Sequence, residues 1–139
     1  MKRQIRLGML IILVFAMLTG CGRVNAYIMK QQESEDYQML HRVMNSFKSA
    51  IVSTEFEGNI DVKSVRELKT NYPEFYEEMS TFLEKKPEEI ENDFLSDACQ
   101  GGTIAFLKIV NPVELKVKVS VIKDGRTVVG QDGRNFEIE

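Results

Sequence analysis

The chain has 139 residues, a formal net charge of −3 and a 43% share of hydrophobic side chains. A chain of this length supports one hydrophobic core without disulfide or metal staples, so we expect a single globular domain. The acidic balance and the lack of grouped Lys and Arg argue against nucleic-acid binding, because neutralising phosphates requires clustered cations. With only two cysteines, the fold is not expected to depend on disulfides.

The first 20 residues have the composition of an export signal. Residues 7–17 form an apolar run that is too short to span a bilayer, which takes about 20 residues. The run ends in Leu18-Thr19-Gly20-Cys21, and this tetrapeptide resembles the lipobox of bacterial lipoproteins. The cationic side chains that precede the run are Lys2, Arg3 and Arg6.

The lipobox resemblance implies that the Cys21 thiol receives a diacylglyceryl group and that Cys21 becomes the first residue of the mature chain. Two acyl chains would hold the protein at the extracytoplasmic face of a bacterial cell membrane, since stable anchoring takes two membrane signals. Removal of residues 1–20 would shift the net charge from −3 to −6, leaving 15 basic against 21 acidic side chains. The alternative is an uncleaved anchor helix in which Cys21 is a buried thiol.

The sequence divides into a signal peptide over residues 1–20, a tether or helix start over 21–33, and a single domain over 34–139. A long amphipathic helix is predicted over 34–53, where apolar residues recur at steps of three and four. Ser34 is expected to cap this helix, with Asp36 in its first turn. The predicted buried face consists of Tyr37, Leu40, Val43, Met44, Phe47 and Ile51.

Residues 54–97 are predicted to form short helices, because Gly58, Pro73 and Pro87 interrupt the helical pattern. Asp61 is a candidate cap for the first of them, and the two prolines suit the first positions of helices near 73–84 and 87–97. Two apolar stripes are expected to be buried: Phe75, Met79, Phe82 and Leu83 on one helix, and Ile90, Phe94 and Leu95 on the next.

After Gly101-Gly102 the hydrophobic period changes to two, which indicates strands. The alternation of Val113, Leu115, Val117, Val119 and Val121 with polar residues predicts one dry sheet face and one wet face that carries Lys116 and Lys118. We expect an α+β fold, in which the long N-terminal helix and the short helices pack on a three- or four-stranded antiparallel meander. Strands are predicted over 103–110, 113–122, 126–129 and 134–138, with turns at Asn111-Pro112, Asp124-Gly125 and Asp132-Gly133.

No group of residues has the spacing of a catalytic or metal site. His41 is the single histidine and has no metal-ligating neighbour. Glu77-Glu78 and Glu88-Glu89 lack the ligand loop of a calcium site and are predicted to be solvated helix faces. Cys99 has no adjacent cation to activate it and is expected to be a structural thiol. We therefore expect a non-catalytic protein without cofactor or metal.

The element order also resembles that of type IV pilin-like proteins, which place a long helix before an antiparallel sheet. Residues 26–30, continuing to Ala50, are similar to the region where such helices leave the membrane. A prepilin is cleaved after a Gly that precedes an aromatic residue or Met, and Gly8-Met9 fits this pattern. The mature chain would then have Leu13 where a pilin has Glu at its fifth position. Two functions stay open: a lipid-anchored binding or assembly module that acts on an envelope protein or ligand, and a pilin-like subunit that retains its membrane segment.

Overall fold

The computed structural model describes residues 2–111, 113–128 and 135–139, and for residues 2–25 it describes only the helical backbone. The chain forms two compact units, which divide between Gln31 and Gln32. Among the described residues, no helix is both long enough and apolar enough to cross a membrane. The elements are α1 (Lys2–Thr54), β1 (Ile60–Val62), α2 (Val65–Asn71), α3 (Pro73–Leu83), α4 (Pro87–Asp93), β2 (Thr103–Asn111), β3 (Glu114–Lys123), β4 (Arg126–Thr127) and β5 (Glu137–Ile138).

The predicted α+β class is confirmed, and the sheet is antiparallel throughout. Its strand order is β1-β2-β3-β4, with β5 also pairing with β3. Within the described residues the sheet has five strands instead of three or four, because Ile60–Val62 adds a strand beside β2. This strand had been predicted as a helix start, and Asp61, the expected cap, lies within it.

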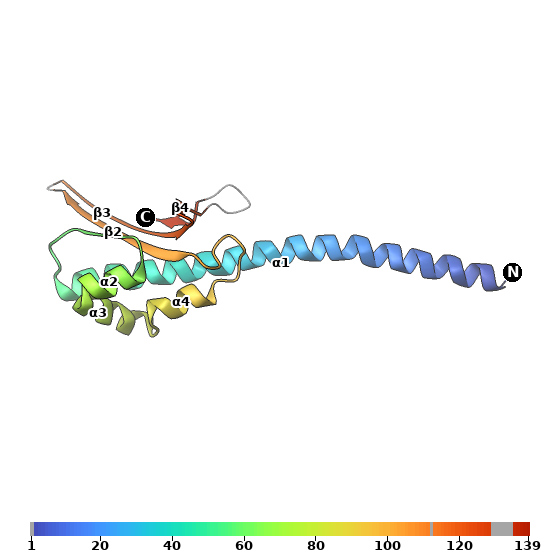
Figure 1. Ribbon diagram of the computed structural model, residues 1–139, viewed down its shortest axis with the longest axis horizontal. Coiled ribbons are helices and arrows are strands. Elements are labelled where there is room, and N and C mark those ends of the chain that lie inside the picture. The colour runs from blue at the N-terminus through green and yellow to red at the C-terminus, as the bar shows by residue number, and fades with distance from the viewer. Residues whose placement is uncertain (1, 112, 129–134) are drawn as a thin grey trace. The chain divides into compact units, whose positions relative to one another are not determined.

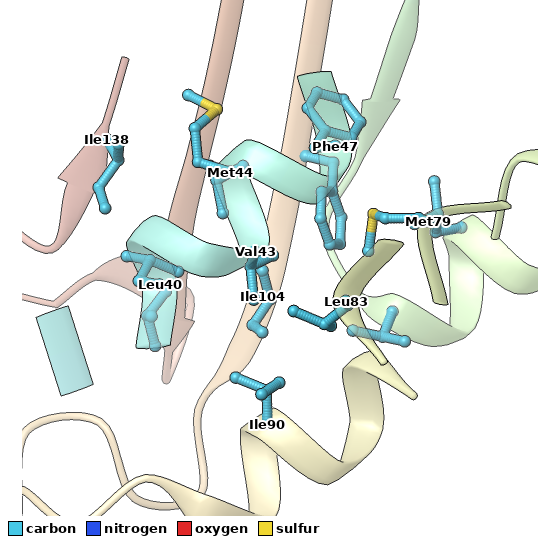
Figure 2. Packing of buried hydrophobic residues seen from close by; sticks show 14 of the residues in the cluster. Leu40, Val43, Met44, Phe47, Met79, Leu83, Ile90, Ile104 and Ile138 are labelled. Carbon is cyan, nitrogen blue, oxygen red and sulfur yellow. The ribbon is translucent and has the colours of Figure 1, made fainter. Parts of the chain in front are cut away.

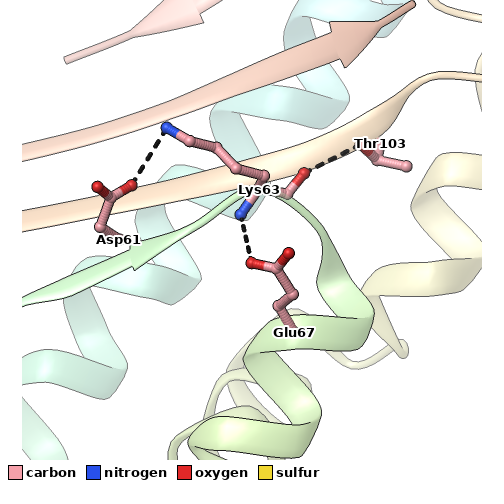
Figure 3. A network of polar contacts seen from close by, with 4 residues as sticks. All are labelled: Asp61, Lys63, Glu67 and Thr103. Carbon is pink, nitrogen blue, oxygen red and sulfur yellow. Dashed lines mark hydrogen bonds and ion pairs between the residues drawn. The ribbon is translucent and has the colours of Figure 1, made fainter. Parts of the chain in front are cut away.

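Ser64 caps α2 in place of Asp61, since its Oγ accepts a hydrogen bond from the Glu67 N–H at 3.1 Å. Glu67 in turn accepts from the Lys63 N–H at 3.0 Å. The Lys63 carbonyl accepts from Thr103 Oγ1 at 3.1 Å, which ties this corner to β2 (Figure 3). These side-chain contacts fix the turn from β1 into α2.

In the second unit, the sheet lies along one side of the C-terminal part of α1, and α3 and α4 lie along the other (Figure 1). Phe47 of α1 joins these layers: its ring lies 5.2 Å from Phe106 of β2 and 5.4 Å from Phe75 of α3, between ring centroids. Figure 2 shows other members of the same core, among them Ile104 on β2 and Leu83 on α3. The long helix is therefore the central layer of a single core.

Five of the six residues predicted for the buried face of the long helix are buried, and Tyr37 is exposed. Phe82 is exposed because Tyr76 occupies the opposite flank of the α3 stripe, which turns Phe82 toward solvent. Leu95 is exposed because α4 ends at Asp93, two residues before it, so helical periodicity no longer sets its direction. The remaining residues of the two predicted stripes are buried.

The predicted cap at Ser34 is wrong, because α1 continues through residues 21–33 and Ser34 lies inside it. The turn at Asp124-Gly125 forms as predicted, with φ of 55° and 75° at the two residues. Gly102 is buried against β3, and a Cβ added there would lie 2.7 Å from Val121 Cγ1. Pro112 and the predicted turn at Asp132-Gly133 lie outside the described residues.

Candidate functional site

A groove of about 560 Å³ lies between the last turns of α1 and the start of β3. Its apolar lining comes from Ile51 and Val52 on the helix and from Leu115 and Val117 on the strand. Four charged residues also line the groove: Lys48, Glu114, Lys116 and Glu139. The groove therefore combines apolar and charged residues from the helix end, the strand and Glu139.

The groove exists because the β2–β3 hairpin continues past the residues that α1 covers. In the register, Phe106 pairs with Val119 in the core, whereas the last apolar row pairs Val110 with Leu115 near the turn. Leu115 is 57% exposed and Val113 is 90% exposed, so the prediction of one dry face along the whole strand is wrong at its first two apolar positions. Figure 1 shows the hairpin rising from the helix layer toward its tip.

In the part of the chain that the structure describes, one side of β3 is an open edge along the groove. The Val121 N–H donates to Phe136 O at 3.3 Å, and Val121 O accepts from the Val128 N–H at 3.0 Å. Odd-numbered residues of β3 therefore direct their backbone groups away from β2. Of the described strands, β4 and β5 cover this side only within residues 119–123. Leu115 and Val117 thus present their N–H and C=O groups at the edge of the sheet.

The side of β2 that faces away from β3 is covered. Strand β1 covers Phe106–Lys108, the Asn59 side chain accepts from the Val110 N–H at 2.8 Å, and Glu91 accepts from the Ile104 N–H at 2.8 Å. Burial raises the pKa of the Glu91 carboxyl, and the Ile104 N–H acts in the opposite direction. Exposed strand edges are usually covered or blunted, as on this side of β2. The side of β3 along the groove differs, because no described strand covers Leu115 or Val117.

Lys108 lies opposite Val117 in the register and is buried, which the sequence did not predict. Its Nζ donates to the carbonyl oxygens of Phe56 and Gly58, each at 2.6 Å, and lies 4.9 Å from the centre of the Phe56 ring. Burial lowers the pKa of Lys108, and the charge of Glu57 acts in the opposite direction. The side chain holds the loop after α1 against β2 and is a structural group.

Cys99 is fully buried, and burial raises the pKa of its thiol to about 12, while a hydrogen bond with Ser96 acts in the opposite direction. The thiolate is therefore strongly disfavoured, which makes the group a poor nucleophile. Asp36 lies nearby, buried, and is fully engaged with backbone and hydroxyl donors of Leu95 and Ser96. Its expected place in a first helical turn is wrong, because α1 begins far upstream.

The other candidate residues from the sequence are not brought together. His41 is exposed, and its ring packs edge-on against Tyr37 at 5.7 Å. Glu78 accepts from Ser53 Oγ at 2.6 Å, and Glu88 accepts from Tyr76 Oη at 2.5 Å, so these carboxylates hold neighbouring elements together. Burial, with Glu88 adding to it, raises the pKa of Tyr76. Within the described residues, no group of three or more His, Cys, Asp or Glu side chains could hold a metal ion.

Cys21 lies in the part of α1 of which only the backbone is described. Comparison with known proteins gives no relative: no protein-family model, curated protein or solved structure matches the chain. The groove and the open edge of β3 therefore form the candidate site. This site was not predicted from the sequence. The feature that pointed to it is the position of two apolar residues, Val113 and Leu115, beside the predicted turn at Asn111-Pro112.

Proposed function

We propose that the chain is a lipid-anchored protein of the bacterial cell envelope, held at the extracytoplasmic face through Cys21, that acts as a non-catalytic assembly module. The observation that carries the assembly role is the open edge of β3 beside an apolar groove. A strand edge of this kind binds another chain by adding a strand, which supplies main-chain hydrogen bonds and side-chain contacts together. The partner would be another envelope protein or a further copy of the chain.

Two further features support a binding role over a catalytic one. In the described part of the chain, burial perturbs the pKa values of four groups that each contact another residue of the chain: Glu91, Tyr76, Cys99 and Lys108. Among the described residues, no buried side-chain nitrogen or oxygen lacks a hydrogen-bond partner. Perturbed pKa values also occur in structural networks, and these four groups are of that kind.

Intact-mass measurement tests the anchoring. The full-length chain would be expressed in a bacterial host, extracted from membranes with detergent and weighed beside Cys21→Ala and Cys99→Ala variants. We expect residues 21–139 plus a diacylglyceryl group for the native chain, the same modification on Cys99→Ala, and none on Cys21→Ala. A native chain that is unlipidated and retains residues 1–20 would contradict the proposal.

One observation favours a second candidate function, that of a pilin-like structural subunit. Helix α1 is assigned without interruption from Lys2 to Thr54, and its C-terminal part packs on an antiparallel sheet, as the pilin resemblance implies. In that case the apolar segment would stay attached and pack among copies in a filament. The same mass measurement separates the two functions, because a pilin-like chain would begin at Met1 or Met9 and carry no lipid.

A further inference from the structure

We propose that the partner at the open edge of β3 is a second copy of this chain, paired antiparallel about a two-fold axis that passes through Leu115. The inference rests on the proposed assembly role and names its partner. It is carried by the residues around the open edge, which read Val113-Glu114-Leu115-Lys116-Val117. When two copies of this segment pair antiparallel about Leu115, each apolar residue lies opposite an apolar residue, and each acidic residue lies opposite a basic residue.

The backbone geometry selects this register. Leu115 directs its N–H and C=O to the open side, so Leu115 can pair with Leu115 of the second copy as a hydrogen-bonded pair. Glu114 then lies opposite Lys116 of the second copy, and this ion pair occurs twice because of the symmetry. Val117 then lies opposite Val113 of the second copy, the residue that precedes β3.

The neighbouring symmetric register is unfavourable for two reasons. An axis through Lys116 would place two lysines directly opposite each other, which is destabilising. In that register the added strand would also occupy the position opposite Lys118, where the extension of the β5 pairing places Glu139 of the same chain. With the axis at Leu115, the pair formed by Val117 and Val113 lies one residue short of this position.

The groove provides room for the side chains of the second copy. Leu115 and Val117 line the groove, so they lie on the sheet face that α1 flanks. A strand added at the edge would place its own Leu115 on the same face, next to Val52, which is 76% exposed. Pairing would therefore remove the most exposed apolar residues of the hairpin and helix end from water: Val52, Val113 and Leu115.

The paired segment is short, so the dimer is expected to be weak in dilute solution. Anchoring both copies to one membrane raises their effective concentration and favours the pairing without any additional contact. The proposed lipid at Cys21 and the proposed edge contact thus act together, although each can be measured alone.

Disulfide trapping in the full-length chain tests the axis. Paired Cα atoms across a hydrogen-bonded antiparallel pair lie about 5.5 Å apart, within the range of a disulfide. Leu115→Cys in membranes treated with copper phenanthroline should therefore give a cross-linked dimer. Val110→Cys is the matched control, because it is exposed on the same hairpin but one strand farther from the axis. The native chain reports any background from Cys21 and Cys99.

Charge exchange tests the register. Within one copy, Lys116 Nζ lies 4.0 Å from Glu139 Oε1, so every variant in this series carries Glu139→Gln. In that background Glu114→Lys alone and Lys116→Glu alone should each lower the cross-linked fraction of Leu115→Cys about fivefold, because each places like charges opposite one another across the axis. The combined exchange of both residues should restore it. Equal cross-linking at Leu115 and Val110, or no recovery in the combined exchange, would overturn the proposal. The intact mass of the same samples reports the lipid on Cys21 separately, so failure of the anchor and failure of the edge contact are distinguishable.

Discussion

Asp36 on α1 holds Ser96, which lies 60 residues later in the chain, through two hydrogen bonds to one carboxylate oxygen. Asp36 Oδ2 accepts from the Ser96 N–H at 2.9 Å and from Ser96 Oγ at 2.5 Å, and Oδ1 accepts from the Leu95 N–H at 2.8 Å. Asp36 is 1% exposed, so the carboxylate has no alternative partner in water. The contact fixes the segment after α4 against the long helix.

Replacement of Asp36 by Ala should destabilise the domain by about 3 kcal/mol, because it leaves buried donors on Leu95 and Ser96 without an acceptor. Urea denaturation of the full-length chain in non-ionic detergent, followed by circular dichroism, would measure the change. Glu35→Ala is the control, since Glu35 is exposed on the same helical turn, and it should change stability by less than about 0.5 kcal/mol. Equal effects of the two substitutions would refute the role assigned to Asp36.

Cys99 should resist alkylation in the folded chain at neutral pH and react once urea unfolds it. Burial raises the thiol pKa from 9.0 to about 12, so folding favours the protonated form. The corresponding stability is fully present below about pH 9 and is lost as the pH rises toward 12. A Cys21→Ala background leaves one thiol, whose reaction with a chromogenic disulfide reports the exposure directly. The alkaline loss should be smaller in a Cys21→Ala, Cys99→Ala double variant.

Local patterns were sufficient for much of the fold. The spacing of Leu40, Val43 and Phe47 predicts a buried helical face, and Asp124-Gly125 predicts a tight turn, because both depend on residues close in sequence. The same local rules failed at Ser34 and Asp61. Ser34 resembles a cap but lies in a helix that upstream residues continue, and Asp61 lies in a strand that requires pairing with Leu107 to form.

The candidate site depends on long-range register, which the local pattern at Val113 and Leu115 does not determine. Leu115 and Val119 occupy equivalent positions in the alternating pattern of β3. Leu115 is nevertheless exposed and Val119 is buried, because α1 covers only Val119. Lys108 occupies a core position of β2, and its burial depends on the carbonyl oxygens of a loop some 50 residues earlier. Such relationships appear only when the helix and the hairpin are placed together.

Lys108→Met should lower stability by about 2 kcal/mol, because it keeps the aliphatic volume and removes the donor shared by two carbonyl oxygens. Limited proteolysis should show faster cleavage within residues 55–59. Lys123→Met is the matched control: Lys123 also donates to a backbone carbonyl, that of Asp97 at 2.8 Å, but at an exposed site. Its effect should stay below about 1 kcal/mol, and a larger loss there than at Lys108 would contradict the assignment.

Val52→Asp should separate self-association from stability. Val52 is 76% exposed at the end of α1, so a charged residue there should change the free energy of unfolding by less than about 0.5 kcal/mol. The same change puts a carboxylate beside the apolar residues that the edge pairing would bring together, so the cross-linked fraction of Leu115→Cys should fall. Phe82→Asp, at an exposed position of α3 outside the groove, is the control and should leave cross-linking unchanged. If both substitutions lower cross-linking equally, the groove is not part of the contact, and the edge strand alone determines it.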